Sequence, residues 1–290
     1  MELKAQSKWG WLIAAYLFLA GLGGGAYVTG AVAGFLGQEW ADIAKIGICL
    51  GFPCVAIGCL FLLADLGSMK NFWRAGVKPS TSWIARGTII ITIFMIVGAI
   101  HIFAVVTGQF AEAAGARNVL SSIGIVFAFG TMIYTGVLLA ASRPIAFWST
   151  AMLPLLFLVS ALSTGMMAVI LIGSIAGSDS AALHTLAQFD IMLIVLEIIV
   201  LVFFLQATHR VYESRASAQL VLAGAVAPLF WWGVAVLGLL APLLLELLGV
   251  AWLAAICGII GGLFLRQVIL AGGIHAPLRA GRFEIALPIV

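Results

Sequence analysis

The residues most able to do chemistry in this sequence are ionisable side chains set within or at the end of long apolar stretches. They are Asp65, His101, Asp190 and Glu197. A charge at the middle of a bilayer is costly, so ionisable residues within membrane helices indicate a functional site by default. Imidazole and carboxyl groups can hold and release protons. We therefore predict that these four side chains take part in proton transfer.

The spacing of these residues constrains how they can cooperate. Asp190 and Glu197 lie on one face of a helix, about 10 Å apart along its axis. His101 and Asp190 are expected at matching depths, about eight residues from the same membrane surface, which allows them to pair. Three roles stay open for such a pair: a structural polar contact that fixes helix register, a proton relay, or an ion site.

Composition identifies the elements that must position these residues. Of the 290 residues, 64% are hydrophobic and 9% are charged, and the mean hydropathy is +1.22, far outside the range of soluble domains. A membrane-spanning helix needs about 20 apolar residues. We predict an all-α integral membrane protein, a single transmembrane domain over 1–290, with eight helices at about 9–36, 43–66, 82–106, 119–141, 147–174, 182–208, 219–245 and 248–272.

The first apolar stretch is too long for the core of a signal peptide, so we expect it to be a retained helix. Positive charges then predict the orientation of the bundle. Of the 14 Lys and Arg residues, only Lys45 and Arg117 fall on the side opposite the N-terminus. Both termini are therefore predicted to lie in the cytoplasm, with the protein in a bacterial or archaeal cytoplasmic membrane. The net charge of +3 reports topology and gives no reason to expect nucleic-acid binding.

The cysteines and histidines argue against a redox centre bound by this protein. Its four cysteines form no CxxC or cluster-binding run and are predicted to be small buried residues. Only His101 lies well inside a predicted helix, whereas a haem between membrane helices needs two facing histidines. We predict no haem, iron–sulfur cluster or metal site here. Any electron transfer must then use a mobile cofactor or one carried by another subunit.

Glycines are concentrated in the first predicted helix, in the stretch AGLGGGAYVTGAVAG. Gly21 with Gly25 and Gly30 with Gly34 form two small-xxx-small patterns, which usually allow helices to pack closely. A second interpretation is that the missing side chains leave a flat slot for an apolar ring such as a quinone.

Three motifs resemble, in order, those of the NrfD/PsrC family of membrane subunits. They are WGWLIAAYLFLAGLGGGAY, then LLADLGSMKNF followed by KPSTSW, and YTGVLLAASRPIAFWSTAMLPLLFLVSALSTG. The resemblance covers roughly residues 9–170, and the last three predicted helices match in hydropathy alone. It implies a cofactor-free, quinone-reactive subunit beside a ferredoxin-like iron–sulfur protein, itself usually joined to a molybdopterin catalytic subunit. It also places the quinone, menaquinone or ubiquinone, in a bundle of the first four helices.

The resemblance assigns site residues at the N-terminal side of that bundle. Tyr134 matches the pocket tyrosine of the fourth helix, and Asp65 falls at or next to the acidic position that closes the second. Tyr16 and Leu12 stand where a histidine and an asparagine are expected, so the partner of each quinone oxygen stays open. We also place Gly21 and, from its position at the pocket mouth, Trp83 in the quinone site.

The basic loop after Asp65 completes the prediction. Lys70, Arg74 and Lys78 are expected to form a docking rim, because a basic edge suits an acidic ferredoxin-like surface. The function predicted is exchange of electrons between the iron–sulfur partner and the quinone pool, with Asp65 exchanging protons or pairing with Lys70 or Arg74. The alternatives are a secondary transporter, or another ion-translocating subunit, and a purely structural anchor.

Overall fold

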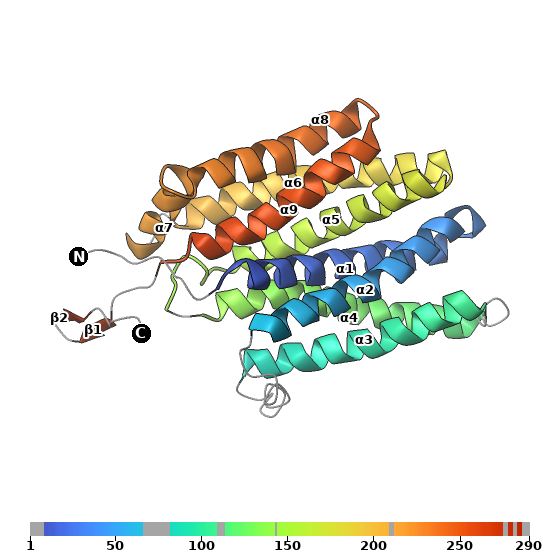
Figure 1. Cartoon of the computed structure of the whole chain (residues 1–290), viewed down its shortest axis with the longest axis horizontal. Helices are drawn as coiled ribbons and strands as arrows, with labels where there is room; N and C mark the ends of the chain where they lie inside the picture. The colour runs from blue at the N-terminus through green and yellow to red at the C-terminus, as the bar shows by residue number, and fades with distance from the viewer. Residues whose placement is uncertain are drawn as a thin grey trace.

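The computed structural model describes residues 9–65, 82–108, 114–142, 144–208, 212–274, 278–280 and 283–285. Within these residues, eight helical segments are long and apolar enough to cross a membrane, which confirms the predicted fold class. The segments run side by side in alternating directions, so that α1 begins and α9 ends at the same end of the bundle (Figure 1). A short antiparallel hairpin of β1 (Leu278–Ala280) and β2 (Phe283–Ile285) lies beyond them.

The helix bounds follow the predicted stretches closely in the first six spans. They are α1 (Trp11–Leu36), α2 (Ala41–Asp65), α3 (Trp83–Thr107), α4 (Ala114–Ala140), α5 (Met152–Ala176) and α6 (Ser180–Ala207). A single 3-10 turn, η1 (Gln38–Trp40), joins α1 to α2. The eighth span is α9 (Ala251–Ala271).

The seventh span differs from the predicted 219–245. Residues Tyr212–Leu222 form a separate short helix, α7, and the spanning segment begins only at Leu229. It starts as a π-helix, η4 (Leu229–Leu240), and continues as α8 (Ala241–Leu247). Pro242 explains the change of helix type: it has no N–H and its ring would clash with a carbonyl of the preceding turn. The π register, in which Ala241 N–H bonds to Val236 O, relieves that conflict.

Helix α1 lies at the centre of the bundle, because its glycines allow neighbouring helices to approach it closely. It packs against α2, α4, α5 and α9, and 83% of its most apolar window is buried, compared with 28% for α2. A Cβ on Gly25 would clash with the backbone of Ala161 on α5, and one on Gly30 would lie 2.7 Å from Gly47 Cα on α2. Close packing of neighbouring backbones is therefore what these glycines do in the fold.

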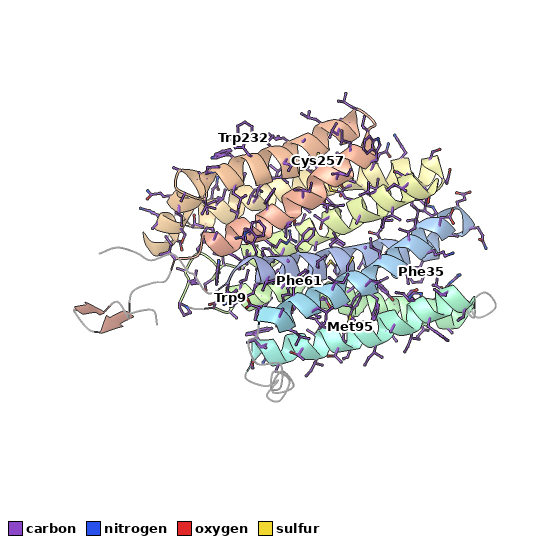
Figure 2. The ribbon with its side chains drawn as sticks, viewed as in Figure 1. Trp9, Phe35, Phe61, Met95, Trp232 and Cys257 are labelled. Carbon is purple, nitrogen blue, oxygen red and sulfur yellow. The ribbon has the colours of Figure 1, made fainter. Side chains whose placement is uncertain are left out.

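The outer surface of the bundle is apolar, as a lipid-facing surface must be. Trp232 on η4 and Phe35 on α1 project outward from the helices (Figure 2), with 71% and 46% of their surface exposed. The polar side chains with the least exposure lie inside, among them His101, Asp190 and Arg266. These buried polar side chains therefore lie between the helices, away from the lipid-facing surface.

Candidate functional site: two buried polar regions

The first polar region lies at the N-terminal end of α1. Tyr16 and Tyr134, on α1 and α4, are 1% and 6% exposed, and Tyr134 is close enough to Tyr16 to affect it electrostatically. The Tyr16 hydroxyl has no hydrogen-bond partner among the described residues. The Tyr134 ring lies where a side chain on Gly87 of α3 would be, and Cys59 of α2 is also near Tyr16. Four helices thus meet around the two phenols.

Two other predicted site residues lie at the same end but at the surface. Asp65 is the last residue of α2 and is exposed. Trp83 begins α3 and is 45% exposed, with the Arg86 guanidinium 4.6 Å from its ring centroid. Both positions suit the edge of a site better than its interior. The predicted docking residues Lys70, Arg74 and Lys78 lie outside the described residues.

Gly21 lies on the face of α1 that packs against α5 and α9. A Cβ at this position would lie 3.1 Å from Ala161 Cβ on α5 and 3.4 Å from Arg266 Nη2 on α9. Its contacts are those of helix packing, so they do not support its assignment to a quinone slot. The glycine instead makes room for a buried guanidinium.

His101 pairs with a residue that the sequence did not single out. Its Nδ1 lies 2.8 Å from the Tyr27 hydroxyl of α1, and both side chains are fully buried. The Tyr27 ring fills the space that Gly124 of α4 leaves open and meets the Phe94 ring edge-on. The His101–Asp190 contact that matching depths allow is not formed as a hydrogen bond, since the oxygens of Asp190 have no partner in hydrogen-bond geometry within the described part of the protein.

The second polar region lies between α5, α6, α8 and α9. Asp190 is fully buried, and Glu246 of α8, which is 6% exposed, is an ionisable neighbour close enough to affect it. None of the four carboxyl oxygens has a hydrogen-bond partner that the described residues provide. Ser163 of α5 is the adjacent hydroxyl. Two carboxyl groups therefore face each other in a place with no cation beside them in the described structure.

Arg266 and Glu197 form a neighbouring cluster. Arg266 is 1% exposed and donates from Nη1 to Ser160 Oγ and from Nη2 to Phe157 O, the latter at 3.2 Å. Its guanidinium carbon also lies 4.9 Å from the centroid of the Phe157 ring. Glu197, 6% exposed, has Arg266 as its cationic neighbour and Ser160 as its adjacent hydroxyl. The serine thus connects the acid and the base.

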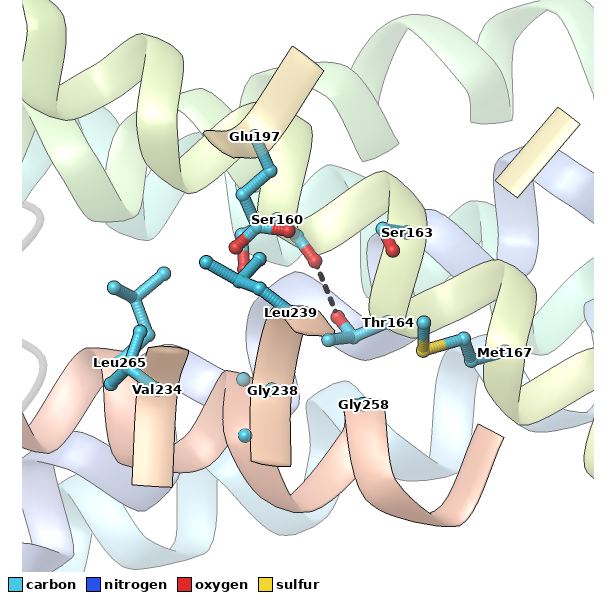
Figure 3. A pocket seen from close by; sticks show the side chains of 12 residues that line it. Ser160, Ser163, Thr164, Met167, Glu197, Val234, Gly238, Leu239, Gly258 and Leu265 are labelled. Atoms are coloured by element: carbon cyan, nitrogen blue, oxygen red, sulfur yellow. Dashed lines mark hydrogen bonds between the residues drawn. The ribbon is translucent and has the colours of Figure 1, made fainter. Parts of the chain in front are cut away.

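A narrow cavity lies beside Glu197, Ser160 and Ser163 (Figure 3). Ser160, Ser163, Thr164 and Glu197 form its polar wall, and α9 and η4 close it with glycines and aliphatic side chains. Thr164 Oγ1 donates to the Ser160 carbonyl at 2.7 Å. The cavity volume of about 10 Å³ is of the size of one water molecule.

A wider groove of about 460 Å³ lies at the opposite end of the bundle from Tyr16, between α2 and α5. Asp42, Lys45 and Ser178 form its polar part. It contacts none of the buried acids, so it belongs to neither polar region.

Glu246 and Arg266 are the functional candidates that sequence reasoning missed. Arg266 was counted among the charges on the N-terminal side, although it lies within α9 and is buried. Glu246 lies one residue beyond the predicted stretch 219–245, so it was not counted among the ionisable residues within helices. The available signal was the sequence itself, since APLLLELLG and GGLFLRQVIL each carry one charge in an otherwise nearly apolar run.

The architecture defines a class: a multi-pass membrane protein with a glycine-rich central helix and buried polar groups in both halves. The model of the polysulphide reductase NrfD family matches residues 2–277, and the protein belongs to that family. Over 266 residues it is 31% identical to a polysulfide reductase component of Wolinella succinogenes, and the match covers 82% of each sequence. It is 28% identical to protein NrfD of Escherichia coli, over 91% of this sequence and 94% of that one. A selenate reductase component of Mesobacillus selenatarsenatis is 23% identical, over 89% of this sequence and 72% of its own.

Proposed function

We propose that this protein is the quinone-binding membrane subunit of a multisubunit reductase, which exchanges electrons between an iron–sulfur partner and the quinone pool. The observation that carries the proposal is the pair of buried phenols, Tyr16 and Tyr134, at one end of the α1–α4 bundle. Relatives named as components of polysulfide and selenate reductases support membership in a reductase complex. Catalysis on the terminal substrate belongs to a partner subunit of the molybdopterin type.

The residues present fit a quinone ring and its two oxygens. Tyr16 has a buried hydroxyl without a partner among the described residues, and a quinone carbonyl would accept its hydrogen bond. Tyr134 offers the second hydroxyl from α4. A bound quinone, menaquinone or ubiquinone, supplies the two-electron, two-proton chemistry that these side chains lack. The protein's part is to hold the ring, exclude water and donate the two hydrogen bonds.

Asp65 is proposed to exchange protons between this site and bulk water. It ends α2 at the surface, on the same side of the bundle as Tyr16 and Tyr134. An exposed carboxylate can take a proton from water and pass it inward, whereas the buried phenols cannot reach water directly. Pairing with Lys70 or Arg74 is compatible with this role.

The orientation proposed puts this end in the cytoplasm. With Arg266 assigned to the interior, the Lys and Arg residues still lie overwhelmingly on the N-terminal side, and Lys45 and Arg117 remain the two on the other. The iron–sulfur partner would then dock from the cytoplasm, with Lys70, Arg74 and Lys78 as its rim. Topology reporters fused after residue 290 and within 109–113 test this: a periplasmic C-terminus would overturn it.

The experiment that tests the function is purification of the tagged protein from its native membrane. We expect a ferredoxin-like subunit and a molybdopterin subunit to co-purify, and the complex to oxidise or reduce added quinol or quinone. A Tyr16→Phe, Tyr134→Phe double variant, purified alongside, should keep its partners and lose quinone affinity. A protein that purifies alone, or a complex without quinone activity, would contradict the proposal and favour a transporter.

A further inference from the structure

The Asp190–Glu246 pair lies far from the proposed quinone site. Helix α8 runs away from both termini and ends at Leu247, one residue after Glu246, whereas Tyr16 is near the start of α1 (Figure 1). The pair therefore cannot touch a quinone held by Tyr16 and Tyr134. Any role it has must be exerted at the other end of the bundle.

The carboxyl groups of Asp190 and Glu246 lack sufficient hydrogen-bond donors in the described structure. A carboxylate only accepts hydrogen bonds, and the four oxygens of Asp190 and Glu246 have no donor in hydrogen-bond geometry among the described residues. The Ser163 hydroxyl is the one described donor close to Asp190, which leaves most of the acceptors unsatisfied. Two adjacent negative charges would also repel each other strongly where water is excluded. A single proton answers both needs, because a protonated carboxyl donates one O–H to its ionised neighbour.

We propose that Asp190 and Glu246 hold one proton between them and form an enclosed proton-storage site at the end of the bundle opposite the phenols. When two carboxyl groups share a buried pocket, the negative charge on one disfavours ionisation of the other, so one of them keeps its proton. Burial of both side chains, 0% and 6% exposed, keeps that proton from exchanging freely with water.

The cavity gives this site a connection to Glu197. Ser163 is adjacent to Asp190 and lines the cavity, and Glu197 lies on the same cavity wall (Figure 3). Once the pair has released its proton, a protonated Glu197 would reload it: the Glu197 proton passes to a water in the cavity, while the Ser163 hydroxyl gives its own proton to Asp190 and receives one from that water. Glu197 is left as a carboxylate beside the Arg266 guanidinium, which stabilises it. A new proton from the N-terminal side would then restore Glu197.

This connection rests on the proposed function, because quinone chemistry would supply the protons, but the storage site can be tested without quinone or turnover. Dicyclohexylcarbodiimide adds to protonated carboxyl groups in apolar surroundings and leaves a stable adduct. At short reaction times, the complex in quinone-depleted membranes should be labelled on Asp190 or Glu246, with one adduct per molecule. No adduct on either residue, or an initial product that already carries adducts on both, would overturn the proposal.

Infrared spectroscopy of variants supplies the second readout. An Asp190→Asn, Glu246→Gln double variant should remove one equivalent of protonated-carboxyl absorbance, because the two carboxyls hold one proton between them. Glu39→Gln makes the matched control, because Glu39 is exposed at the same end of the bundle and should leave the absorbance unchanged. Loss of two equivalents, or of none, would contradict a shared proton, and gel filtration of each variant confirms that it is folded.

Discussion

The two halves of the bundle bury polar groups of different chemistry. Helices α1–α4 bury phenols and an imidazole, namely Tyr16, Tyr27, His101 and Tyr134, whereas α5–α9 bury Asp190, Glu197, Glu246 and Arg266. Phenols donate hydrogen bonds to a neutral ring without bringing a charge into the membrane, and carboxyls move protons. Under the proposed function, the first half would hold the quinone, with Asp65 exchanging protons at its surface, and the second half would carry protons through the interior.

The largest effect should come from replacing Arg266, the one buried cation among the described residues of the second half. Arg266→Met deletes the donors to Ser160 and Phe157 and leaves Glu197 without its cationic neighbour. Breaking a buried charge pair costs about 3–5 kcal/mol, so most of the folded protein should be lost. Fluorescence-detected gel filtration of detergent extracts measures the loss.

Two variants sharpen that test. Arg86→Met removes an exposed guanidinium that lies over Trp83, and it should cost only about 0.5–1 kcal/mol. Adding Glu197→Gln to Arg266→Met should recover part of the folded protein, because the uncompensated acid is then gone. If the Arg266→Met protein were as stable as the Arg86→Met protein, the claim that the buried cation stabilises the second half would be wrong.

Glu197→Gln tests the second half's function separately from its stability. The amide cannot carry a proton, so turnover or the membrane potential built during turnover should fall, by about 10²-fold or more where proton transfer limits the rate. Quinone affinity should be unchanged, because Glu197 lies between α5 and α9 and not beside the phenols. A potential-sensitive dye in proteoliposomes and quinone titration report the two quantities. Full turnover with full potential would reduce Glu197 to a packing residue.

Tyr134→Phe tests the first half. It removes one hydroxyl and almost no volume, so quinone affinity should fall by about 0.5–1.5 kcal/mol, or several-fold, with assembly intact. Tyr27→Phe is the matched control, since it removes the hydrogen bond to His101 instead and should lower stability by a similar amount without changing quinone affinity. Equal quinone kinetics in wild type and Tyr134→Phe would count against the assignment.

The smallest effect is expected at the surface. Asp65→Asn should slow proton-coupled quinone turnover and change its pH–rate profile, because the amide cannot exchange protons. If Asp65 only pairs with a basic side chain, the variant will lose no more than about 0–1 kcal/mol of stability and keep its profile. Turnover measured across pH distinguishes the two outcomes.

Local patterns in the sequence predicted most of the fold, and long-range contacts explain what they missed. The apolar stretches identified eight spans, because each helix must satisfy its own backbone in lipid independently of its neighbours. The π-helix η4 was not foreseen, since it answers a conflict at Pro242 within a helix that still looks continuous in hydropathy. Which face of α1 each glycine serves also depends on neighbours that no local pattern names.

The candidate site was predictable in kind but not in pairing. Buried His101, Asp190 and Glu197 were identifiable from their apolar surroundings, yet depth alone matched His101 to the wrong partner. The depth of a residue in the membrane can be read from its own helix, whereas its pairing depends on which helices are adjacent. The true partner, Tyr27, looks like an ordinary aromatic residue in the sequence.

The central claim is that quinone binds at the phenol end of the first half, and photo-crosslinking tests it most directly. A photoreactive quinone analogue would be activated in native membranes that contain the assembled complex, and the modified peptides would be identified by mass spectrometry. Our account predicts adducts near Tyr16 on α1 and near Tyr134 on α4, and their loss when excess natural quinone competes. Competable adducts on α6 or α9, beside Glu197 and Arg266, would contradict it.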